Sequence, residues 1–273
     1  MKKCVISCVQ MFIRPLDVTG NTERALYFLN KAKREHKSDL VVFQESVTTG
    51  FTPNMSEKAF LKVIDRVPGK QIAPILDAAK KLKLHIVWPT YEKVGQKIYN
   101  SAILIGSNGK IIGKYCKTHP FDKESTERGG WTTPGSKMRV FQTPFAKIGM
   151  IICFDGDYPE ASRLLAKKGA EIIVRPSALL RNYEIWSLTN RARAFDNHVF
   201  LAAANATGFD AAGRHYYGHS MIVGPAGNIM ALAAAQEDII SAELDPKMIR
   251  QTFPGSPARR VYDHLTDLNP RLK

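Results

Sequence analysis

The chain has 273 residues, of which 44% are hydrophobic and 23% charged, as is ordinary for a soluble globular protein of one large or two small domains. Its apolar runs fall short of the ~20 residues that a membrane-spanning helix needs. The formal net charge is +14. Because the basic residues are scattered along amphipathic patterns without interleaved aromatic side chains, we expect neither nucleic acid nor a membrane surface as a partner.

Short β-rich runs alternate with helical patterns in the first half of the chain. One of these runs, "DLVVFQE", is continuously apolar, as in strands that are buried on both faces of a sheet. Asn21 or Thr22 is the expected cap of the first helix. The pattern predicts, in chain order, a strand at 3–11, a helix at 20–36, a strand at 39–45, a helix at 71–83 and a strand at 84–92.

The second half continues the alternation and adds hairpins. The dipeptide Asn108-Gly109 is a strong signal for a two-residue hairpin turn. The predicted elements are a hairpin at 99–118, a strand at 146–154, a helix at 158–169, a strand at 170–178, a helix at 182–198 and strands within 199–208, 216–233 and 238–244. Such mixing of strands, helices and hairpins favours one domain over residues 1–273, a layered α/β sandwich with a mixed sheet.

Three polar residues each end an apolar strand. Glu45 ends "LVVFQE", Lys117 ends "KIIGKYCK" and Cys153 ends "KIGMIIC". Ligands of α/β sheets bind in the crevices at strand ends. Each residue alone has a structural explanation, as a cap, a solvated charge or a small core side chain. Their joint occurrence predicts a catalytic set.

These three residue types allow nucleophilic attack on a carbonyl group. A carboxylate at Glu45 can take the proton of the Cys153 thiol, and an ammonium at Lys117 can stabilise an oxyanion. The backbone N–H of Phe154, directly after the nucleophile, can donate to the same oxyanion. The "FDGD" turn and the helix that follows it also favour a thiolate.

The other cysteines and the histidines predict neither a metal site nor a cofactor. Cys4 and Cys8 fall on one face of the first strand and are expected in the core, and Cys116 is expected to pack on the face opposite Lys117. The spacings match no metal-ligand pattern. Four unpaired cysteines fit a reduced, cytoplasmic protein.

The chain resembles the nitrilase, or carbon–nitrogen hydrolase, superfamily. The resemblance rests on segments that run in order through nearly the whole chain: "VVFQE", "GKYCKTHPFD", "TTPG", "GMIICFDGDYPE", "GAEIIVRPSA", "NRARAFDNHVFLAAAN" and "YYGHSMIVGPAGNIM". It implies a four-layer αββα sandwich, usually dimeric, with a Glu-Lys-Cys triad at Glu45, Lys117 and Cys153. Departures are Gln44, where many members have proline, and Cys116, where many have arginine.

The resemblance also implies a second glutamate between the lysine and the cysteine. Glu124 and Glu127 are the two candidates. We choose Glu127, because it lies nearer to "WTTPG", where the family's glutamate usually precedes its Pro-Gly.

The implied reaction is hydrolysis of a carbon–nitrogen bond in a small amide through a thioester on the cysteine. Phe-Asp-Gly after Cys153, in place of the Trp-Glu of true nitrilases, favours amides over nitriles. N-Carbamoyl amines or N-carbamoyl amino acids are the alternative substrates. A non-catalytic scaffold or a nucleic-acid-associated protein is a less favoured alternative.

Motif positions also suggest substrate-binding residues and an interface. The candidates are Phe51, Phe154, Ser177 and Ala178, with Arg175 as either a substrate-carboxylate ligand or an internal ion-pair partner. The tail at about 251–273 carries apolar side chains and is expected to pack on a partner subunit in a homodimer or higher homo-oligomer.

Overall fold

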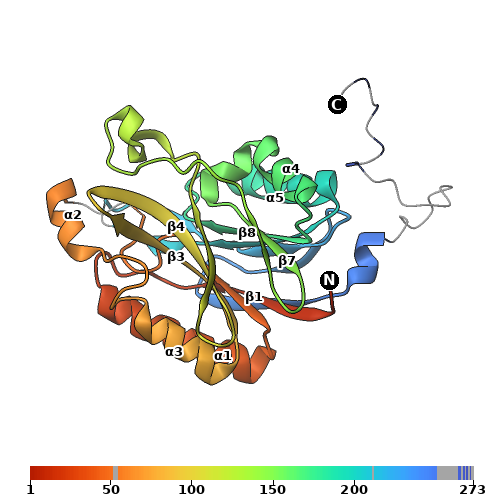
Figure 1. Cartoon of the computed structure of the whole chain (residues 1–273), viewed down its shortest axis with the longest axis horizontal. Helices are drawn as coiled ribbons and strands as arrows, with labels where there is room; N and C mark the ends of the chain where they lie inside the picture. Colours follow the sequence, from red (N-terminus) through yellow and green to blue (C-terminus); the bar gives the residue numbers. More distant parts are fainter. Residues whose placement is uncertain are drawn as a thin grey trace.

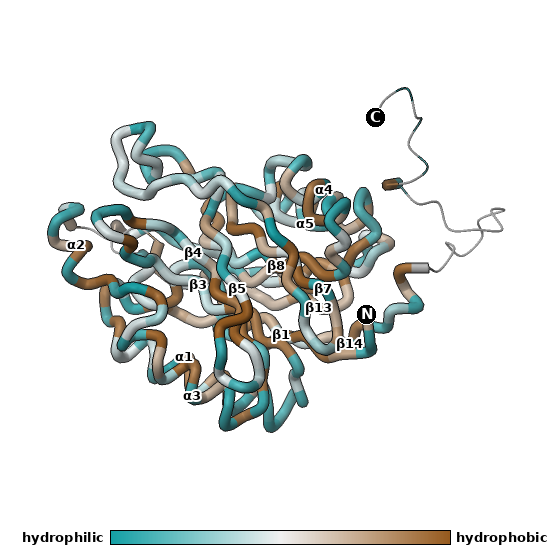
Figure 2. Tube along the Cα trace, viewed as in Figure 1, coloured by the Kyte–Doolittle hydropathy of each residue, from teal (hydrophilic) through white to brown (hydrophobic). Residues whose placement is uncertain are grey.

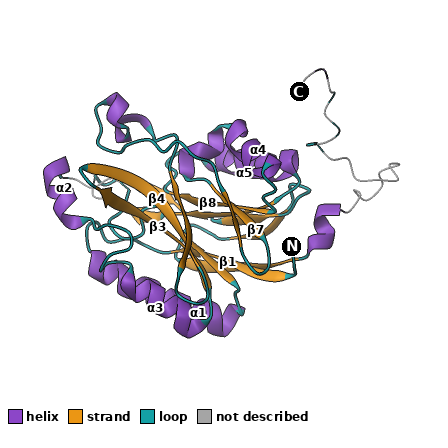
Figure 3. Cartoon of the chain, in the orientation of Figure 1, coloured by secondary structure: helices purple, strands orange, loops and turns teal. Residues whose placement is uncertain are grey.

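Two mixed β-sheets lie face to face, with helices on both outer sides (Figure 1). The computed structural model describes residues 1–51, 55–210 and 212–250, together with 264, 265, 267, 269 and 271. Figure 3 shows the same order of layers, with strands inside and helices outside. This arrangement confirms the predicted αββα sandwich.

The first sheet has the strand order β14-β1-β2-β3-β4-β5. Its strands are β1 (Cys4–Gln10), β2 (Leu40–Phe43), β3 (His85–Val94), β4 (Lys97–Ile105), β5 (Ile111–Cys116) and β14 (Asp238–Leu244). β1, β2 and β3 are parallel, whereas β4 is antiparallel to both β3 and β5. β2 and β5 therefore run in the same direction, and their carboxyl ends lie at the same edge.

The second sheet has the order β13-β12-β9-β8-β7-β6. Its strands are β6 (Val140–Gln142), β7 (Lys147–Met150), β8 (Ile172–Ser177), β9 (Phe200–Asn205), β12 (Met221–Val223) and β13 (Ile229–Leu232). β7, β8 and β9 are parallel. A separate hairpin consists of β10 (Thr207–Phe209) and β11 (His215–Tyr217).

Five helices complete the described part of the chain. They are α1 (Val18–His36), α2 (Glu57–Val63), α3 (Ala73–Leu82), α4 (Pro159–Lys167) and α5 (Tyr183–Asn197). α1 and α3 cover the first sheet, and α4 and α5 cover the second (Figure 1). None of the described helices is long and apolar enough to cross a membrane.

The apolar runs are buried on both faces, as their sequence predicts. In β2, Leu40 and Val42 join the core between the sheets, whereas Val41 and Phe43 join the core beneath α1 and α3. This alternation follows from the two-residue period of a strand. Hydrophobic segments accordingly follow the central strands in Figure 2, and hydrophilic ones follow the outer loops.

Some of the predicted element boundaries differ from those in the structure. α1 begins at Val18, before the predicted start, because Asp17 rather than Asn21 or Thr22 caps it, its side chain accepting a hydrogen bond of 2.9 Å from the Gly20 N–H. The short elements α2 and β6 were not predicted, since neither has a full period of apolar residues.

The predicted interface tail, 251–273, lies largely outside the described residues. Of its described residues, Leu265 packs against the core that contains the second sheet, and His264 Nδ1 lies 3.2 Å from the carbonyl oxygen of Phe195 in α5. This part of the tail therefore contacts its own chain. Packing on a partner subunit stays a prediction.

We expect Leu29→Ala in α1 to lower the free energy of unfolding by about 2–5 kcal/mol, the usual cost of emptying a fully buried leucine site. Glu23→Ala, at an exposed position of the same helix, is the control. Denaturant unfolding of both variants measures the difference. A loss that is equally small in both would contradict the placement of α1 over the first sheet.

Candidate active site

The ends of four strands converge on one place between the sheets. Glu45 follows β2 and Lys117 follows β5 in the first sheet, while Cys153 follows β7 in the second. The carboxyl end of β8 meets that of β2, because the Glu45 N–H lies 3.4 Å from the Ser177 carbonyl oxygen. The parallel directions within each sheet thus bring the three predicted residues to a common edge.

Lys117 is the centre of the site. Its ammonium is fully buried and donates hydrogen bonds of 2.8 Å to Glu45 Oε1 and 2.8 Å to Glu124 Oε2. Glu45 Oε2 accepts a further hydrogen bond of 2.9 Å from the Ala178 N–H. Two carboxylates therefore share one ammonium away from water.

Asn100 in β4 completes this network and was missed by the sequence reasoning. Its side-chain amide donates to Glu45 Oε1 at 2.7 Å and to Glu124 Oε1 at 2.8 Å. The predicted two-residue turn at 108–109 would place Asn100 opposite Lys117 in the hairpin. The observed turn is one residue longer, because the Gly106 N–H donates to the Lys110 carbonyl oxygen at 2.8 Å, and a register shift between Leu104 and Ile105 restores the expected pairing further along the strands. The Lys117 N–H indeed donates to the Asn100 carbonyl oxygen at 2.8 Å.

The structure brings Glu124, and not the chosen Glu127, to Lys117. Glu124 ends a short 3₁₀ turn (Asp122–Glu124) that directs its side chain inward, where it also accepts a 2.8 Å hydrogen bond from the Phe121 N–H. Glu127 lies in the next 3₁₀ turn (Thr126–Arg128), which buries none of its residues. The choice of Glu127 is thus corrected by geometry, since proximity to the Pro-Gly motif in sequence does not fix which turn faces the site.

Charge and burial oppose each other in this network. Burial raises the pKa of Glu45, and the nearby charge of Glu124 raises it further, against the opposing effect of Lys117. Burial alone would lower the pKa of Lys117, but the two carboxylates outweigh burial and raise it. Lys117 is therefore a permanent cation, and Glu45 is a stronger base than an exposed carboxylate.

Cys153 begins a 3₁₀ turn (Cys153–Asp157) and has a φ of 46°. A left-handed conformation is unfavourable for a residue other than glycine and persists only where its surroundings hold it. Burial raises the pKa of its thiol, as does the charge of Glu45, whereas Lys117 and Arg175 lower it. The thiol therefore stays protonated until a base removes its proton.

Asp155 fixes the cysteine turn relative to the lysine strand. Its carboxylate accepts hydrogen bonds from the Ile152 N–H at 2.9 Å, the Tyr115 hydroxyl at 2.7 Å and the His119 N–H at 2.8 Å. Tyr115 and His119 flank Lys117, and Ile152 precedes Cys153. The aspartate of the "FDGD" motif thus connects the nucleophile to its cation across the two sheets.

Arg175 holds the same turn through internal contacts. It is fully buried, its Nε donates to the Cys153 carbonyl oxygen at 2.9 Å, and its Nη1 donates to Asn190 Oδ1 at 2.7 Å. A Cβ atom at Gly156 would lie 2.1 Å from the Arg175 guanidinium carbon, so this turn requires glycine. Of the two roles considered, the internal one is observed.

Ser177, at the end of β8, contacts the backbone of its own strand. Its side chain is buried, with the hydroxyl 3.3 Å from the Arg175 carbonyl oxygen. Phe51, Phe154 and Ala178, in contrast, line the space beside Cys153. Arg175 and Ser177 thus contact backbone atoms, whereas the other three predicted residues line this space, and substrate binding by any of the five stays a prediction.

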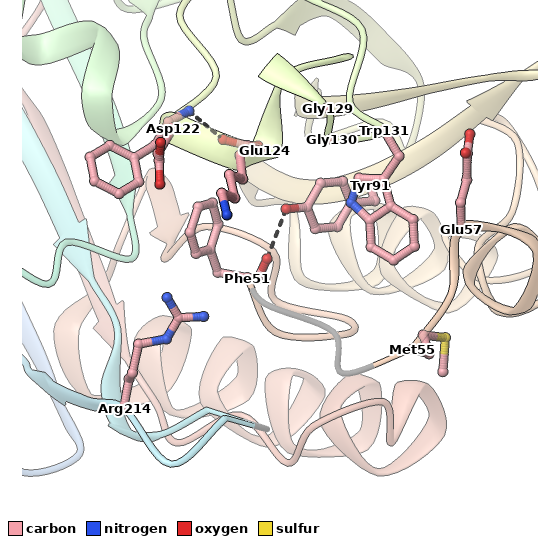
Figure 4. Close-up of a pocket in the computed structure, with 12 residues that line it drawn as sticks. Phe51, Met55, Glu57, Tyr91, Asp122, Glu124, Gly129, Gly130, Trp131 and Arg214 are labelled. Atoms are coloured by element: carbon pink, nitrogen blue, oxygen red, sulfur yellow. Dashed lines mark hydrogen bonds between the residues drawn. The ribbon is translucent and has the colours of Figure 1, made fainter. Parts of the chain in front are cut away.

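Three cavities meet at Phe51, and one of them is lined by Glu45. The one beside Cys153 holds about 20 Å³, and its neighbour, which reaches Glu124, holds about 500 Å³. Figure 4 shows Phe51 near Glu124 in the wider cavity, with Tyr91 beside it, whose hydroxyl donates to the Phe51 carbonyl oxygen at 2.9 Å, and Trp131 beyond Tyr91. Phe51 also places its ring 4.9 Å from Lys117 Nζ. Only a small group has room at the sulfur, whereas the outer cavity admits a larger one.

Within the described residues, no group of three or more His, Cys, Asp or Glu side chains has the geometry to hold a metal ion. The site's polar groups instead contact one another: the ammonium, the two carboxylates and the amide of Asn100. Beside a thiol, this donor set suits proton transfer and oxyanion stabilisation.

The chain is similar to known proteins over nearly its whole length. A yeast (Saccharomyces cerevisiae) protein named omega-amidase NIT3 is 32% identical, over 98% of this chain and 97% of its own length. The crystal structure of yeast Nit3, described as a member of branch 10 of the nitrilase superfamily, superposes with a TM-score of 0.79 over 91% of this chain and 92% of its own. A Pyrococcus abyssi protein named nitrilase is also 32% identical, over 90% of this chain and 91% of its length.

A family model agrees with these pairwise similarities. The model described as carbon-nitrogen hydrolase matches residues 5–253, a span that contains Glu45, Asn100, Lys117, Glu124 and Cys153. The chain therefore belongs to the carbon-nitrogen hydrolase family.

Proposed function

We propose that the chain hydrolyses the carboxamide of a small organic acid through a thioester on Cys153. The observation that carries this proposal is the buried ammonium of Lys117, held at 2.8 Å by both Glu45 and Glu124 at the end of the strand beside the cysteine. A base, a cation and a thiol at one edge are the groups that acyl transfer requires.

Glu45 begins the reaction as general base. It takes the thiol proton as the Cys153 sulfur attacks the carbonyl carbon, and Lys117 with the Phe154 N–H stabilises the oxyanion. When the tetrahedral intermediate collapses, the C–N bond breaks and the protonated Glu45 gives its proton to the departing nitrogen. Ammonia leaves, and the acyl group remains on the sulfur.

Hydrolysis of the thioester regenerates the enzyme. Glu45 takes a proton from the attacking water, the C–S bond breaks, and the sulfur recovers its proton from Glu45 as the acid leaves. Glu124 holds Lys117 in position throughout. Because two carboxylates flank one ammonium, uptake of a proton by Glu45 removes a net negative charge from the site, which favours this step.

An amide fits this mechanism better than a nitrile. Amide cleavage expels a nitrogen atom that must be protonated, and Glu45 carries the required proton after the first step. A nitrile has no leaving group in that step. The relatives' names include both omega-amidase and nitrilase. An experiment therefore has to compare amides with nitriles as substrates. The narrow space at Cys153 supports an unsubstituted carboxamide end.

We also propose a homodimer in the cytoplasm. Leu164 of α4 and Leu188 of α5 are 47% and 67% exposed on the outer helical layer, and a second copy of the chain would cover them. The free cysteines support a reducing compartment.

A panel of small amides, N-carbamoyl amines and nitriles tests the reaction. We expect ammonia release from amides, without carbon dioxide, and no turnover by Cys153→Ala. Ammonia with carbon dioxide from the carbamoyl compounds alone would favour the alternative substrate class. Turnover of nitriles with amides left intact, or wild-type turnover by the alanine variant, would contradict the proposal.

The two candidate glutamates are separated by matched substitutions. We expect Glu124→Gln to lower kcat on the order of a hundredfold or more, because it removes one of the two charges that hold Lys117. Glu127→Gln, at an exposed position, should leave kcat near the wild-type value. Steady-state kinetics on one amide measures both. The reverse ranking would restore Glu127.

The pH profile of kcat/KM reports the base. Glu45 acts only when deprotonated, and its pKa is raised above the ordinary 4.5, so kcat/KM should fall as the pH drops through a value above 4.5. The Asn100 hydrogen bond favours the charged form, so Asn100→Leu should move this acid limb to higher pH. Asn30→Leu, at an exposed position in α1, is the control. A limb that shifts to lower pH in Asn100→Leu would contradict the assignment of Glu45.

A further inference from the structure

A small cavity borders Glu45 on the side away from the sulfur. Its volume is about 20 Å³, and Phe51 and Ala178 line both this cavity and the one at the sulfur. Its other walls come in part from the segment after β1, with Ile13, and from the hairpin β10–β11, with Phe209. The catalytic base therefore has a small space of its own.

This volume suits a molecule with a single heavy atom. A water molecule needs about 10–15 Å³ of such space, and ammonia is similar in size. A methyl group added to the nitrogen would have to displace part of the wall, where Ile13 is buried in the core beneath α1 and α3. The cavity therefore accommodates ammonia or water and excludes a substituted amine.

The polar groups of the wall favour a hydrogen-bond donor. Both charged residues among its described lining are acids, Glu45 and Asp210. Glu45 Oε2 accepts a hydrogen bond of 2.9 Å from the Ala178 N–H, and a carboxylate oxygen can accept a second one. The Tyr216 hydroxyl donates to Asp210 Oδ2 at 3.2 Å, so its oxygen can accept in turn. An N–H or O–H group fits this wall better than an anion does.

The cavity also lies close to the protein surface. Phe209 in its wall is 58% exposed, and Pro15, which also lines it, is exposed. A small molecule therefore has a short way to solvent that does not pass through the wide cavity at Glu124.

The proposed reaction has to place three groups around the carbonyl carbon. The oxyanion needs Lys117 and the Phe154 N–H, and the acyl chain has the wide cavity. The nitrogen has to reach Glu45, which protonates it. Of the three cavities that meet at Phe51, the one described here alone is lined by Glu45.

We propose that this cavity is the leaving-group site, which receives the departing ammonia and then the water that replaces it, and so restricts the enzyme to unsubstituted carboxamides. The inference rests on the proposed amide hydrolysis. The C–N bond breaks and the nitrogen takes its proton from Glu45 within this space. Water then occupies the same place and gives a proton to Glu45 as the C–O bond forms. The C–S bond breaks, and Glu45 returns that proton to the sulfur.

Enlarging the cavity tests this role, with the fastest primary amide of the panel and its N-methyl derivative as substrates. Wild-type protein should release methylamine much more slowly than ammonia. Ile13→Ala should raise the N-methyl-to-primary ratio of kcat/KM about tenfold or more, because one methyl group in a close-fitting pocket decides about 10- to 200-fold in rate. Phe209→Ala, at the exposed rim, should raise the ratio in the same direction with a smaller loss of stability.

Leu180→Ala is the matched control. Leu180 lines the cavity at the sulfur and is not among the residues that line the one at Glu45. Its truncation should leave the ratio unchanged, whatever it does to the rate on both amides. The unfolding midpoint of each variant is measured to show that it folds.

Methanol added to the buffer tests the water step independently. It attacks the same thioester in place of water and yields the methyl ester, while Glu45 takes its hydroxyl proton. Its methyl group would lie where that of methylamine lies. Ile13→Ala should therefore raise the ratio of methyl ester to acid, and Leu180→Ala should not.

The outcomes are distinguishable. A wild-type protein that cleaves the N-methyl amide as fast as the primary one would overturn the inference, while the proposed function would stand. Ratios that stay at the wild-type value in both Ile13→Ala and Phe209→Ala, or that rise equally in Leu180→Ala, would overturn it as well. An ester ratio that does not rise in Ile13→Ala would contradict a shared place for ammonia and water. A wild-type protein that releases ammonia from no amide of the panel would contradict the proposed function itself.

Discussion

The structure depends on one buried ammonium placed between two carboxylates. Lys117 has no access to water, and its charge is balanced by Glu45 and Glu124 at 2.8 Å each. Removing one carboxylate from such an arrangement leaves a buried charge without its partner, which is costly. The amide nitrogen of Asn100 donates to both carboxylates and so bridges and orients them. The chemistry of the site therefore depends on this pairing of buried charges, and not on apolar packing alone.

The sandwich places the Cys153 thiol beside the buried network of Lys117, Glu45 and Glu124. The lysine and both carboxylates are held by the first sheet and its connections, whereas Cys153 follows a strand of the second. Asp155 bridges them by binding both the turn of the cysteine and the residues that flank the lysine. Arg175 supports the strained cysteine from beneath. Arg175, which the motif offered as a possible substrate ligand, thus holds the backbone of Cys153.

The sequence predicted what depends on local pattern. Glu45, Lys117 and Cys153 were predicted because each follows an apolar run, and the structure places them at one edge of the sheets. The αββα layers followed from the family resemblance. What failed depends on long-range geometry. Glu124 and Glu127 are three residues apart, and only the direction of a 3₁₀ turn decides which faces Lys117. Arg175 and Ser177 lie in the last three residues of β8, but their side chains are buried in the protein. Asn100 required the register of the hairpin to be followed back to Lys117.

The most direct test of the account is to trap the acyl group on the enzyme. Wild-type protein is mixed with a turned-over amide, quenched in acid within one turnover and digested, and its peptides are weighed by mass spectrometry. We expect the peptide containing Cys153 to gain the mass of the amide minus ammonia, and the peptide containing Cys116 to gain no mass. Steady ammonia release with no adduct on Cys153, or an adduct on Cys116 instead, would contradict it.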